Sequence, residues 1–331
     1  MFFYLSGMKT TLLFLSVFLS ANLFGQNVYI PDANFKAYLV GNPEINTNED
    51  TEIQNGEALN YYGNIDCSGL NISDLTGIEA FTALIELNCR FNQLTSLDLS
   101  QNTALTELDC RYNQLTSLDL SQNIALTNLY CGSNNAMISL DVSQNNALTT
   151  LDCDELNITS LDVSQNTALT NLECIATSIT SLDVSQNTAL EYLNCSESFL
   201  TCLNVRNGNN ENLVLINEEN QVVLSCIQVD NVMQAEDFVE NLQWVVSNEE
   251  VNSPISFSED CGTVCSGCAP TSAIDIQVAC DSYTWIDGNT YTSSNNSATF
   301  LTTNSAGCDS IITLDLTINT PSIGTDVQEI C

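Results

Sequence analysis

The chain has 331 residues, with only 5 lysine or arginine residues against 41 aspartate or glutamate residues and no histidine. A formal charge of −36 at pH 7 would repel nucleic acids and anionic membranes, whereas it favours divalent cations and cationic partners. The lack of histidine excludes Ser-His-Asp and Cys-His nucleophile pairs and every histidine-ligated zinc site.

Residues 1–25 are typical of a secretory signal peptide. Lys9 precedes an apolar run over residues 12–24, and Gly25-Gln26 offers a cleavage point. The run is too short for a comfortable membrane span, and no other segment of the sequence approaches one. We therefore expect a mature protein that is secreted or held on the outer cell surface.

Residues 26–63 are predicted to form an N-terminal helical cap. Asp32 is suited to cap a short helix that stops at Gly41. The loop that follows has the outline of an EF-hand, with oxygen-bearing side chains at Asn46, Asn48, Asp50, Glu52 and Glu57. It departs from that motif at its first position, which is asparagine, and at Thr51, where the sharp turn requires glycine. The alternatives are a calcium site and a polar turn between two cap helices.

Residues 64–230 carry an internal repeat. Copies of Leu-x-x-Leu-x-Cys begin at Leu84, Leu105, Leu126, Leu148, Leu169 and Leu190, spaced 21 residues apart with a single step of 22. A fixed period of this length is the leucine-rich-repeat signature, here with cysteine in the third apolar position. Each copy continues into a second extended segment, so one repeat completes one coil. A single coil buries too little to be stable, and we expect the coils to stack into a curved, β-rich solenoid of parallel strands.

Cysteines occur at the same position of every repeat. Parallel strands in register hold facing side chains about 4.8 Å apart, beyond the roughly 3.8 Å between the Cβ atoms of a disulfide. We therefore expect buried free thiols along the column of Cys89, Cys110, Cys131, Cys153, Cys174 and Cys195. The disulfide candidates lie elsewhere, as Cys226 with Cys261 and Cys280 with Cys308. The pairing of Cys202, Cys265, Cys268 and Cys331 stays open.

The sequence beyond the repeats divides into further parts. Residues 231–268 are predicted to form a C-terminal cap and residues 269–275 a linker. Residues 276–319 show short strand patterns broken by turns, which predicts a small all-β module that needs a disulfide to be stable. Residues 320–331 are interpreted as the start of a further module or a tail.

The repeats resemble those of internalin-type leucine-rich-repeat proteins, in the variant of secreted bacterial surface proteins. The opening Ile30-Pro-Asp-Ala-Asn-Phe35, the first coil over residues 72–78 and the exit Cys226-Ile-Gln-Val-Asp230 share that resemblance. The segment Ala279-Cys-Asp-Ser-Tyr-Thr-Trp285 is similar to tandem β modules of the same secreted proteins, which commonly end in a sorting domain for type IX secretion. The resemblance implies a cell-surface protein that binds its partner on the concave sheet of the solenoid.

Two exposed faces of the repeats have diverged differently. Asp98, Asp119, Asp141, Asp162 and Asp183 recur unchanged from coil to coil. The outward positions around the cysteine-bearing strands vary instead, with basic and aromatic residues in some copies and acidic residues in others. Both faces have had equal time since duplication, so the variable face is predicted to contact the ligand. The constant aspartates form either a solvated face or a row that binds calcium between coils.

The candidate ligand-binding residues on the concave face are Arg90, Phe91, Asp109, Arg111, Tyr112, Tyr130 and Asp152. Arginine and tyrosine concentrate binding energy at protein interfaces. The structural alternative is that Arg90 and Arg111 neutralise Glu86, Glu107 and Asp109 on neighbouring strands.

These observations predict a monomeric, non-catalytic binding or adhesion protein. Its partner would be a protein or carbohydrate at a cell surface, and calcium is the single cofactor that the sequence suggests. The alternative is the recognition portion of a larger secreted enzyme whose catalytic domain lies beyond residue 331. A carboxylate-based hydrolase within the solenoid is the weakest hypothesis, because nothing in the repeats groups two acids in a cleft.

Overall fold

A computed structural model describes residues 25–217, 224, 226–241, 243–246, 255–259, 272–280, 282–303 and 309–319. The chain divides into two units, Met1–Cys265 and Ser266–Cys331, which are treated separately below. The predicted signal peptide lies outside the described residues up to its last position, and the tail over residues 320–331 lies outside them entirely. Among the described helices, none has the length and apolar character needed to cross a membrane.

The N-terminal cap contains helix α2 (Ala33–Gly41) and helix α3 (Asn55–Asn60), and the short 3-10 helix η1 (Ile78–Ala80) lies in the first coil that follows it. Helix α2 begins where predicted, because Asp32 Oδ1 accepts the backbone N–H groups of Asn34 and Phe35 at 2.9 and 3.0 Å. The side chains of Phe35, Leu39 and Phe81 are fully buried. They belong to one buried core with the first coil, and helices α2 and α3 both lie within residues 26–63.

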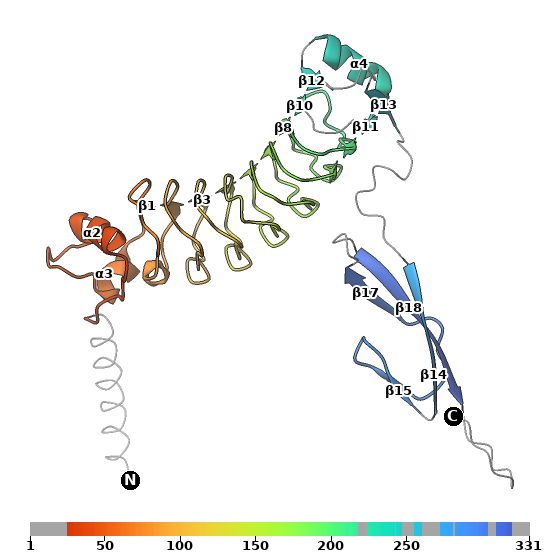
Figure 1. Ribbon diagram of the computed structural model, residues 1–331, viewed down its shortest axis with the longest axis horizontal. Helices are drawn as coiled ribbons and strands as arrows, with labels where there is room; N and C mark the ends of the chain where they lie inside the picture. Colours follow the sequence, from red (N-terminus) through yellow and green to blue (C-terminus); the bar gives the residue numbers. More distant parts are fainter. Residues whose placement is uncertain are drawn as a thin grey trace, which may run out of the picture. The chain divides into compact units, whose positions relative to one another are not determined.

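The repeats form two parallel sheets along one solenoid (Figure 1). The inner sheet has nine strands, in the order β1 (Asn64–Asp66), β2 (Glu86–Asn88), β3 (Glu107–Asp109), β4 (Asn128–Tyr130), β5 (Thr150–Asp152), β6 (Asn171–Glu173), β8 (Tyr192–Asn194), β10 (Val214–Asn217) and β12 (Trp244–Val246). The outer sheet has four, in the order β13 (Ser256–Ser258), β11 (Cys226–Gln228), β9 (Cys202–Asn204) and β7 (Ser181–Asp183). In Figure 1 the coils bend, and the inner sheet lies on the inside of the bend. The predicted leucine-rich-repeat solenoid is confirmed.

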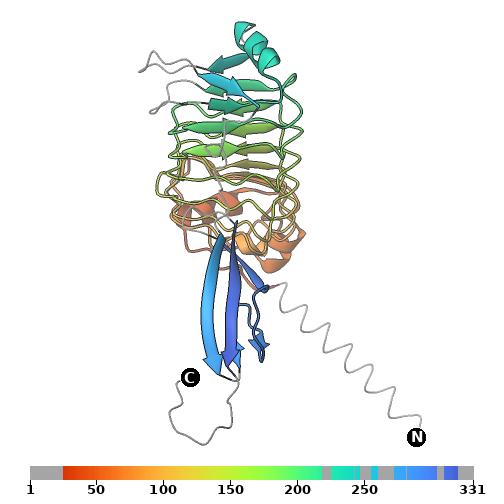
Figure 2. The ribbon, with the colours of Figure 1, turned by 90° about the vertical axis from the view of Figure 1, so that its right-hand side faces the viewer.

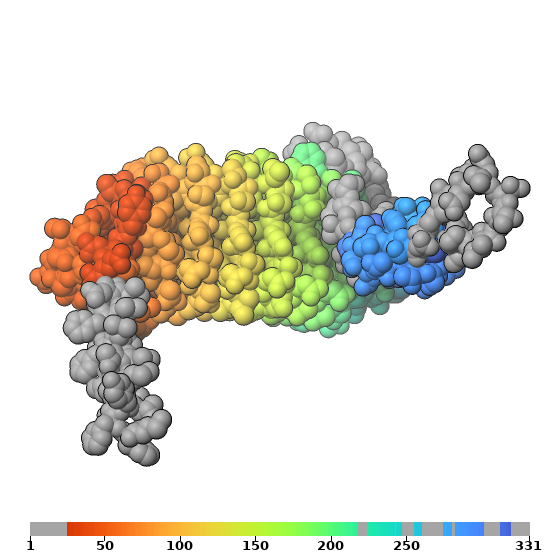
Figure 3. All heavy atoms as spheres, turned by 90° about the horizontal axis from the view of Figure 1, so that it is seen from below, coloured from red at the N-terminus to blue at the C-terminus, as the bar shows by residue number. Residues whose placement is uncertain are grey.

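The strands of the inner sheet pair in exact register, one coil on the next (Figure 2). Leu87, Leu108 and Leu129 face one another as Cα partners, and each is buried. The cysteines that follow the strands form a second column, and Cys67, Cys89, Cys110, Cys131, Cys153, Cys174 and Cys195 are all buried free thiols. The coils themselves appear as parallel ridges when the solenoid is seen from below (Figure 3).

Buried asparagine side chains form hydrogen bonds between neighbouring coils. Asn113 Nδ2 donates to the carbonyls of Cys89 and Cys110 at 3.0 and 3.1 Å, and its Oδ1 accepts the N–H of Leu94 at 3.0 Å. Asn134 repeats this pattern with Cys110, Cys131 and Leu115 one coil further on. A second column, Asn102, Asn123, Asn145, Asn166 and Asn187, donates to carbonyls of the preceding coil. These amides satisfy backbone groups that would otherwise be buried without partners.

The constant aspartates of the repeat have a local structural role. Asp98 Oδ1 accepts the N–H of Ser100 at 2.9 Å, which lowers the pKa of Asp98 below its ordinary value. In the same way Asp119 accepts the N–H of Ser121, and Asp183 accepts the N–H of Ser185. Each aspartate therefore closes a turn of its own coil, which supports the solvated-face alternative for this row.

The solenoid extends further than residue 230, where the sequence repeat fades. Strand β12 pairs in parallel with β10 and places Trp244 beside Leu215 in the leucine column. Helix α4 (Val232–Glu240) precedes β12, and β13 then pairs with β11 in the outer sheet. The predicted C-terminal cap over residues 231–268 thus contributes one further coil, because a tryptophan fills the buried place that leucine fills in the repeats.

Cys202 and Cys226, at this end of the solenoid, each take part in a disulfide bond. The sequence analysis assigned Cys226 a bond to Cys261, which lies outside the described residues, as do Cys265, Cys268 and Cys331. In the other proposed pair, Cys280 with Cys308, Cys308 also lies outside the described residues.

The second unit is a small β module. Its three-stranded sheet has the order β14 (Ser272–Cys280), β18 (Asp309–Asn319) and β17 (Thr299–Thr303), and β15 (Tyr283–Thr284) pairs with β16 (Thr290–Tyr291). Trp285, Leu314 and Leu316 form its buried core. Strand β14 begins at Ser272, within the segment that the sequence analysis assigned to a linker over residues 269–275.

Candidate ligand-binding face

A row of residues with left-handed backbone runs along one edge of the inner sheet. The row comprises Gly69, Phe91, Tyr112, Ser133, Glu155, Ala176 and Glu197, with φ between 53° and 68°. Each member stands two positions after the cysteine of its coil, from Cys67 onward. We call this set the left-handed row.

Backbone hydrogen bonds fix the order of the left-handed row. The N–H of Phe91 donates to Arg111 O at 3.0 Å, and that of Tyr112 to Gly132 O at 3.1 Å. The ladder continues from Ser133 to Asp154 O at 2.7 Å. Members of the row are therefore neighbours in adjacent coils, about 4.8 Å apart.

Only asparagine or glycine adopts left-handed backbone readily, and other residues pay about 1–2 kcal/mol for it. Most members of the row are neither. The turn that leads the chain out of each inner strand imposes this conformation on whatever residue occupies the position. The sequence analysis missed the row, although its constant distance from the repeat cysteine could have revealed it.

Phe91 and Tyr112 form an exposed aromatic stack on the left-handed row. Their ring centroids are 4.3 Å apart with an interplanar angle of 8°, and the two residues are 53% and 46% exposed. The Arg90 guanidinium lies 5.7 Å from the centroid of the Phe91 ring. Two large rings presented to solvent in this way form a surface suited to a partner.

Arg111 does not resemble Arg90 in its surroundings. Its Nε and Nη2 donate to the two oxygens of Asp109 at 3.0 and 2.8 Å, and its Nη1 donates to Asp152 Oδ2 at 3.0 Å. The guanidinium also lies 4.9 Å from the centroid of the Tyr130 ring. The hydrogen bonds that Asp109 accepts from Arg111, together with the negative charges of Asp109 and Asp152, raise the pKa of Arg111.

The predicted site residues are therefore brought together, but in two groups. Asp109 and Asp152 are each only 7% exposed. Both form ion pairs with Arg111, which thereby links strands β3 and β5 across β4. This fits the structural alternative, although with Asp152 in place of Glu86 and Glu107. Arg90 has a longer contact of 3.9 Å to Asp109 and, with Phe91 and Tyr112, remains accessible.

The coil of Asp152 and the coil after it carry further acidic residues, which the sequence analysis did not select as ligand-binding residues. Burial raises the pKa of Asp154 to about 7, and the negative charges of Asp152, Glu173 and Glu155 act in the same direction. The N–H of Ile175, which donates to Asp154 Oδ1 at 2.7 Å, opposes the shift. Burial and Asp152 raise the pKa of Glu173 as well. Their carboxyl groups were not identifiable from the repeat alone, because burial depends on the neighbouring coils.

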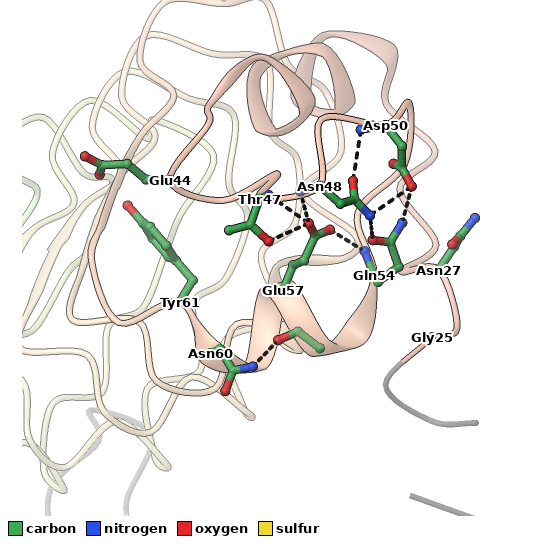
Figure 4. A pocket seen from close by; sticks show the side chains of 11 residues that line it. Gly25, Asn27, Glu44, Thr47, Asn48, Asp50, Gln54, Glu57, Asn60 and Tyr61 are labelled. Atoms are coloured by element: carbon green, nitrogen blue, oxygen red, sulfur yellow. Dashed lines mark hydrogen bonds between the residues drawn. The ribbon is translucent and has the colours of Figure 1, made fainter. Parts of the chain in front are cut away.

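The loop with an EF-hand outline borders a pocket of about 700 Å³ in the N-terminal cap (Figure 4). Glu57 lies at its centre and accepts the N–H groups of Thr47, Asn48 and Gln54 at 2.8, 3.2 and 3.0 Å. Asn48 and Gln54 each donate to Asp50 Oδ2 at 3.0 Å. Side-chain oxygen atoms of Glu57 and Asp50 therefore accept hydrogen bonds from within the loop itself.

The remaining loop residues point to other partners. Glu52 pairs with Lys36 Nζ at 2.6 Å, and the Asn46 amide nitrogen donates to the carbonyls of Val40 and Asp50. In the part of the chain that the structure describes, no group of three or more acidic or cysteine side chains is arranged to hold a metal ion. These contacts support the polar-turn alternative for residues 46–57.

Calcium titration distinguishes the two alternatives for this loop. If the loop is a polar turn, the protein should have the same melting temperature, within about 1 °C, in millimolar calcium and in chelator. Glu57→Ala should cost about 1 kcal/mol, because the half-buried N–H of Gln54 and the exposed N–H groups of Thr47 and Asn48 lose their acceptor. Glu49→Ala in the same exposed loop is the control. A melting temperature that rises with calcium, and does so only when Glu57 is present, would instead establish a calcium site.

No family model matches the chain. Over 76 residues, or 23% of its length, the chain is 42% identical to internalin J of Listeria monocytogenes serotype 4b (strain F2365). The match covers 8% of that protein, so the chain spans a small part of the length of this curated relative.

Solved structures of internalins are similar to the chain. An internalin C2 structure from Listeria monocytogenes has a TM-score of 0.51 and 16% identity, covering 69% of this chain and 94% of that one. The functional domain of internalin J from the same species, which includes a cysteine ladder, has a TM-score of 0.33 and 20% identity, covering 88% and 98%. The fold is thus that of the internalin-type leucine-rich-repeat solenoid.

Proposed function

We propose that the chain is a non-catalytic binding protein, secreted or held on the outer cell surface, which binds a protein or carbohydrate ligand on the inner sheet of its solenoid. The observation that carries this proposal is the contrast between its two exposed faces. The outer aspartates recur because each closes a turn of its own coil, as Asp98 does with Ser100. On the inner face Asn88, Asp109 and Asp152 make the equivalent bond, whereas the two positions that follow each repeat cysteine, from Arg90-Phe91 to Asp154-Glu155, have diversified.

The geometry of the inner face supports a ligand more directly. Phe91 and Tyr112 expose about half of their surface while they stack on each other at 4.3 Å. Exposed aromatic residues beside an accessible arginine are typical of binding hot spots. The resemblance of the repeats to internalins agrees with a binding role at a cell surface.

A binding screen with paired variants tests this proposal. The full chain would be applied to protein and glycan arrays, and every ligand retained would be tested against the double variant Phe91→Asn/Tyr112→Asn. Asparagine accepts left-handed backbone, so the coil should persist while both rings are lost. We expect at least a tenfold loss of affinity, because hot-spot aromatics contribute about 2 kcal/mol or more.

The control for this screen is Ile124→Asn. Ile124 is 64% exposed and lies outside the inner sheet, so its replacement removes an apolar group from another part of the same repeat. Ligands that bind the wild type and both variants equally would place the binding surface elsewhere and contradict the proposal.

A further inference from the structure

Strand β14 of the small β module has a free edge. Its sheet has the order β14, β18 and β17, so β18 pairs with β14 on one side, and none of the described strands pairs with it on the other. The pairing runs in unbroken register from Ser272 opposite Ile311 to Cys280 opposite Asn319, and Figure 2 shows the two long strands side by side. The backbone N–H and C=O groups along the outer edge of β14 therefore form a template for a further strand.

The side chains of β14 alternate between two faces of the sheet. Asp275 and Gln277 lie on the side of the module core, where Asp275 Oδ2 accepts the Nε1–H of the buried Trp285 at 2.8 Å. Ile274, Ile276 and Val278 lie on the opposite side and are 67%, 70% and 65% exposed. This is the reverse of the usual alternation, in which apolar side chains face the core. We call these three residues the β14 stripe.

Strand β14 lacks most features that protect the edges of natural sheets. Edge strands are usually short, interrupted by a bulge, or marked by lysine or proline. β14 has nine residues in unbroken register and contains no lysine, arginine or proline. Its one charged side chain, Asp275, points away from the β14 stripe, and both of its oxygens accept hydrogen bonds, from Gln277 and Trp285. The edge is therefore open to pairing.

The sequence of β14 is self-complementary about Ile276. If an antiparallel copy of the strand pairs with it, centred on Ile276, Ile274 lies opposite Val278 of the second copy and Ile276 lies opposite Ile276. On the other face Asp275 lies opposite Gln277, so no two like charges meet. Cross-strand packing of β-branched side chains stabilises an antiparallel sheet. The strand thus meets the requirement of a two-fold symmetric interface, in which one surface binds its own copy.

The acidic character of the chain opposes this contact only weakly. On the face of the β14 stripe, β18 carries Asp315, which is the Cα partner of Ile276. In the paired modules the two copies of Asp315 are three strand spacings apart, or about 14 Å. This exceeds the Debye length of about 8 Å at physiological ionic strength. The formal charge of −36 still repels a second copy at long range, so association should strengthen as salt is raised.

We propose that the free edge of β14 is a docking surface for a second copy of this chain, and that two β modules join by antiparallel pairing of their β14 strands into one six-stranded sheet. The two β14 stripes then lie together on one face of that sheet. The sequence analysis predicted a monomer, because the apolar face of β14 is evident only once its neighbours are known. A dimer carries two solenoids, which would raise its avidity for a ligand that recurs on a surface.

Sedimentation equilibrium of the full chain across the micromolar range tests for the dimer. Two double variants then test the register. Ile274→Lys/Val278→Lys places lysine opposite lysine in the antiparallel pairing, whereas Ile274→Lys/Val278→Glu places lysine opposite glutamate. We expect the first variant to raise the dissociation constant of the dimer at least tenfold, although it lowers the net negative charge. The second variant should stay within about threefold of the wild type.

Thr313→Lys/Thr317→Lys is the matched control. These threonines are the Cα partners of Ile274 and Val278 in β18, so the same charges are added to the same face, one strand away from the edge. We expect the dissociation constant to change less than threefold. The β14 stripe is exposed and points away from Trp285, so unchanged tryptophan fluorescence in each variant would show that the module remains folded.

Two results would overturn the proposal. One is a chain that remains monomeric throughout the concentration range, at high as well as at low salt. The other is equal weakening by the two double variants, which would show apolar association without the antiparallel register. Neither result affects the proposed function, because substitutions in β14 leave the inner sheet of the solenoid unchanged and its ligands are screened separately.

Discussion

Raising the pH from 8 to 10 should unfold the protein through its column of buried cysteines. The structure buries seven free thiols, and burial raises the pKa of every one of them, to about 12 for Cys67 and Cys195. In the unfolded chain these thiols ionise near their ordinary pKa of 9.0. Above that pH the unfolded state binds fewer protons than the folded state, so the free energy of unfolding falls; below it the contribution is fully present.

The expected magnitude is large because the effect is repeated in every coil. Each thiol that stays protonated only in the folded state removes about 1.4 kcal/mol of stability per pH unit above 9. For the seven thiols the loss is about 10 kcal/mol at pH 10, which matches the whole stability of a typical domain. Urea unfolding at pH values from 7 to 10.5, followed by circular dichroism, measures the slope.

The control is a variant with two fewer buried thiols. Cys110→Ala/Cys131→Ala should be less stable at pH 7, because two sulfur atoms leave small cavities. Its stability should nevertheless fall less steeply above pH 9, by about 2.8 kcal/mol per pH unit. Tyr38 and Tyr61, whose pKa values are also raised by burial, contribute equally to both proteins. Identical slopes would show that the column does not control alkaline stability.

Asn113→Leu should destabilise the solenoid by about 3–6 kcal/mol. Asn113 makes four hydrogen bonds to the backbone of two coils, at 3.0 to 3.3 Å. Leucine has a similar volume but neither donates nor accepts, so the carbonyls of Cys89 and Cys110 and the N–H of Leu94 lose this partner in a buried place. Each such loss costs about 1–3 kcal/mol. Chemical denaturation at pH 7 measures the change.

Thr177→Val provides the graded comparison for this variant. Thr177 lies in the same column and donates to the Cys174 carbonyl at 3.0 Å, and both Thr177 and Asn113 are buried. Loss of that single hydroxyl should cost about 1–2 kcal/mol. If Asn113→Leu cost no more than Thr177→Val, the asparagine bonds would not hold the coils together.

The coil architecture could be predicted from the sequence because it depends on a repeated local pattern. The period fixed which leucines and cysteines share a column, and Asp32 fixed the start of α2. The contacts of Arg111 could not be predicted in the same way. Its side chain passes over Tyr130 to reach Asp152 two coils away, and the one-dimensional repeat carries no information on such reach.

The single 22-residue repeat is a second example of contacts that the sequence pattern does not predict. Leu156 stands where the preceding coils have Asn113 and Asn134, a change that the sequence alone does not explain. In the longer coil the N–H of Met137 donates to Asn134 O at 2.9 Å, whereas Leu115 at the equivalent place donates to an asparagine side chain. The extra residue thus removes the need for an acceptor in the next coil, and leucine becomes acceptable there.

The left-handed row gives the solenoid an unusual freedom to change. Its geometry is imposed by backbone bonds to the coils on either side, whether the occupant is phenylalanine, serine, glutamate or alanine. The scaffold is thereby insulated from the identity of the residues that a partner would meet. Residues of the left-handed row can therefore be substituted one coil at a time, by selection or by design, without a change in the backbone of the solenoid.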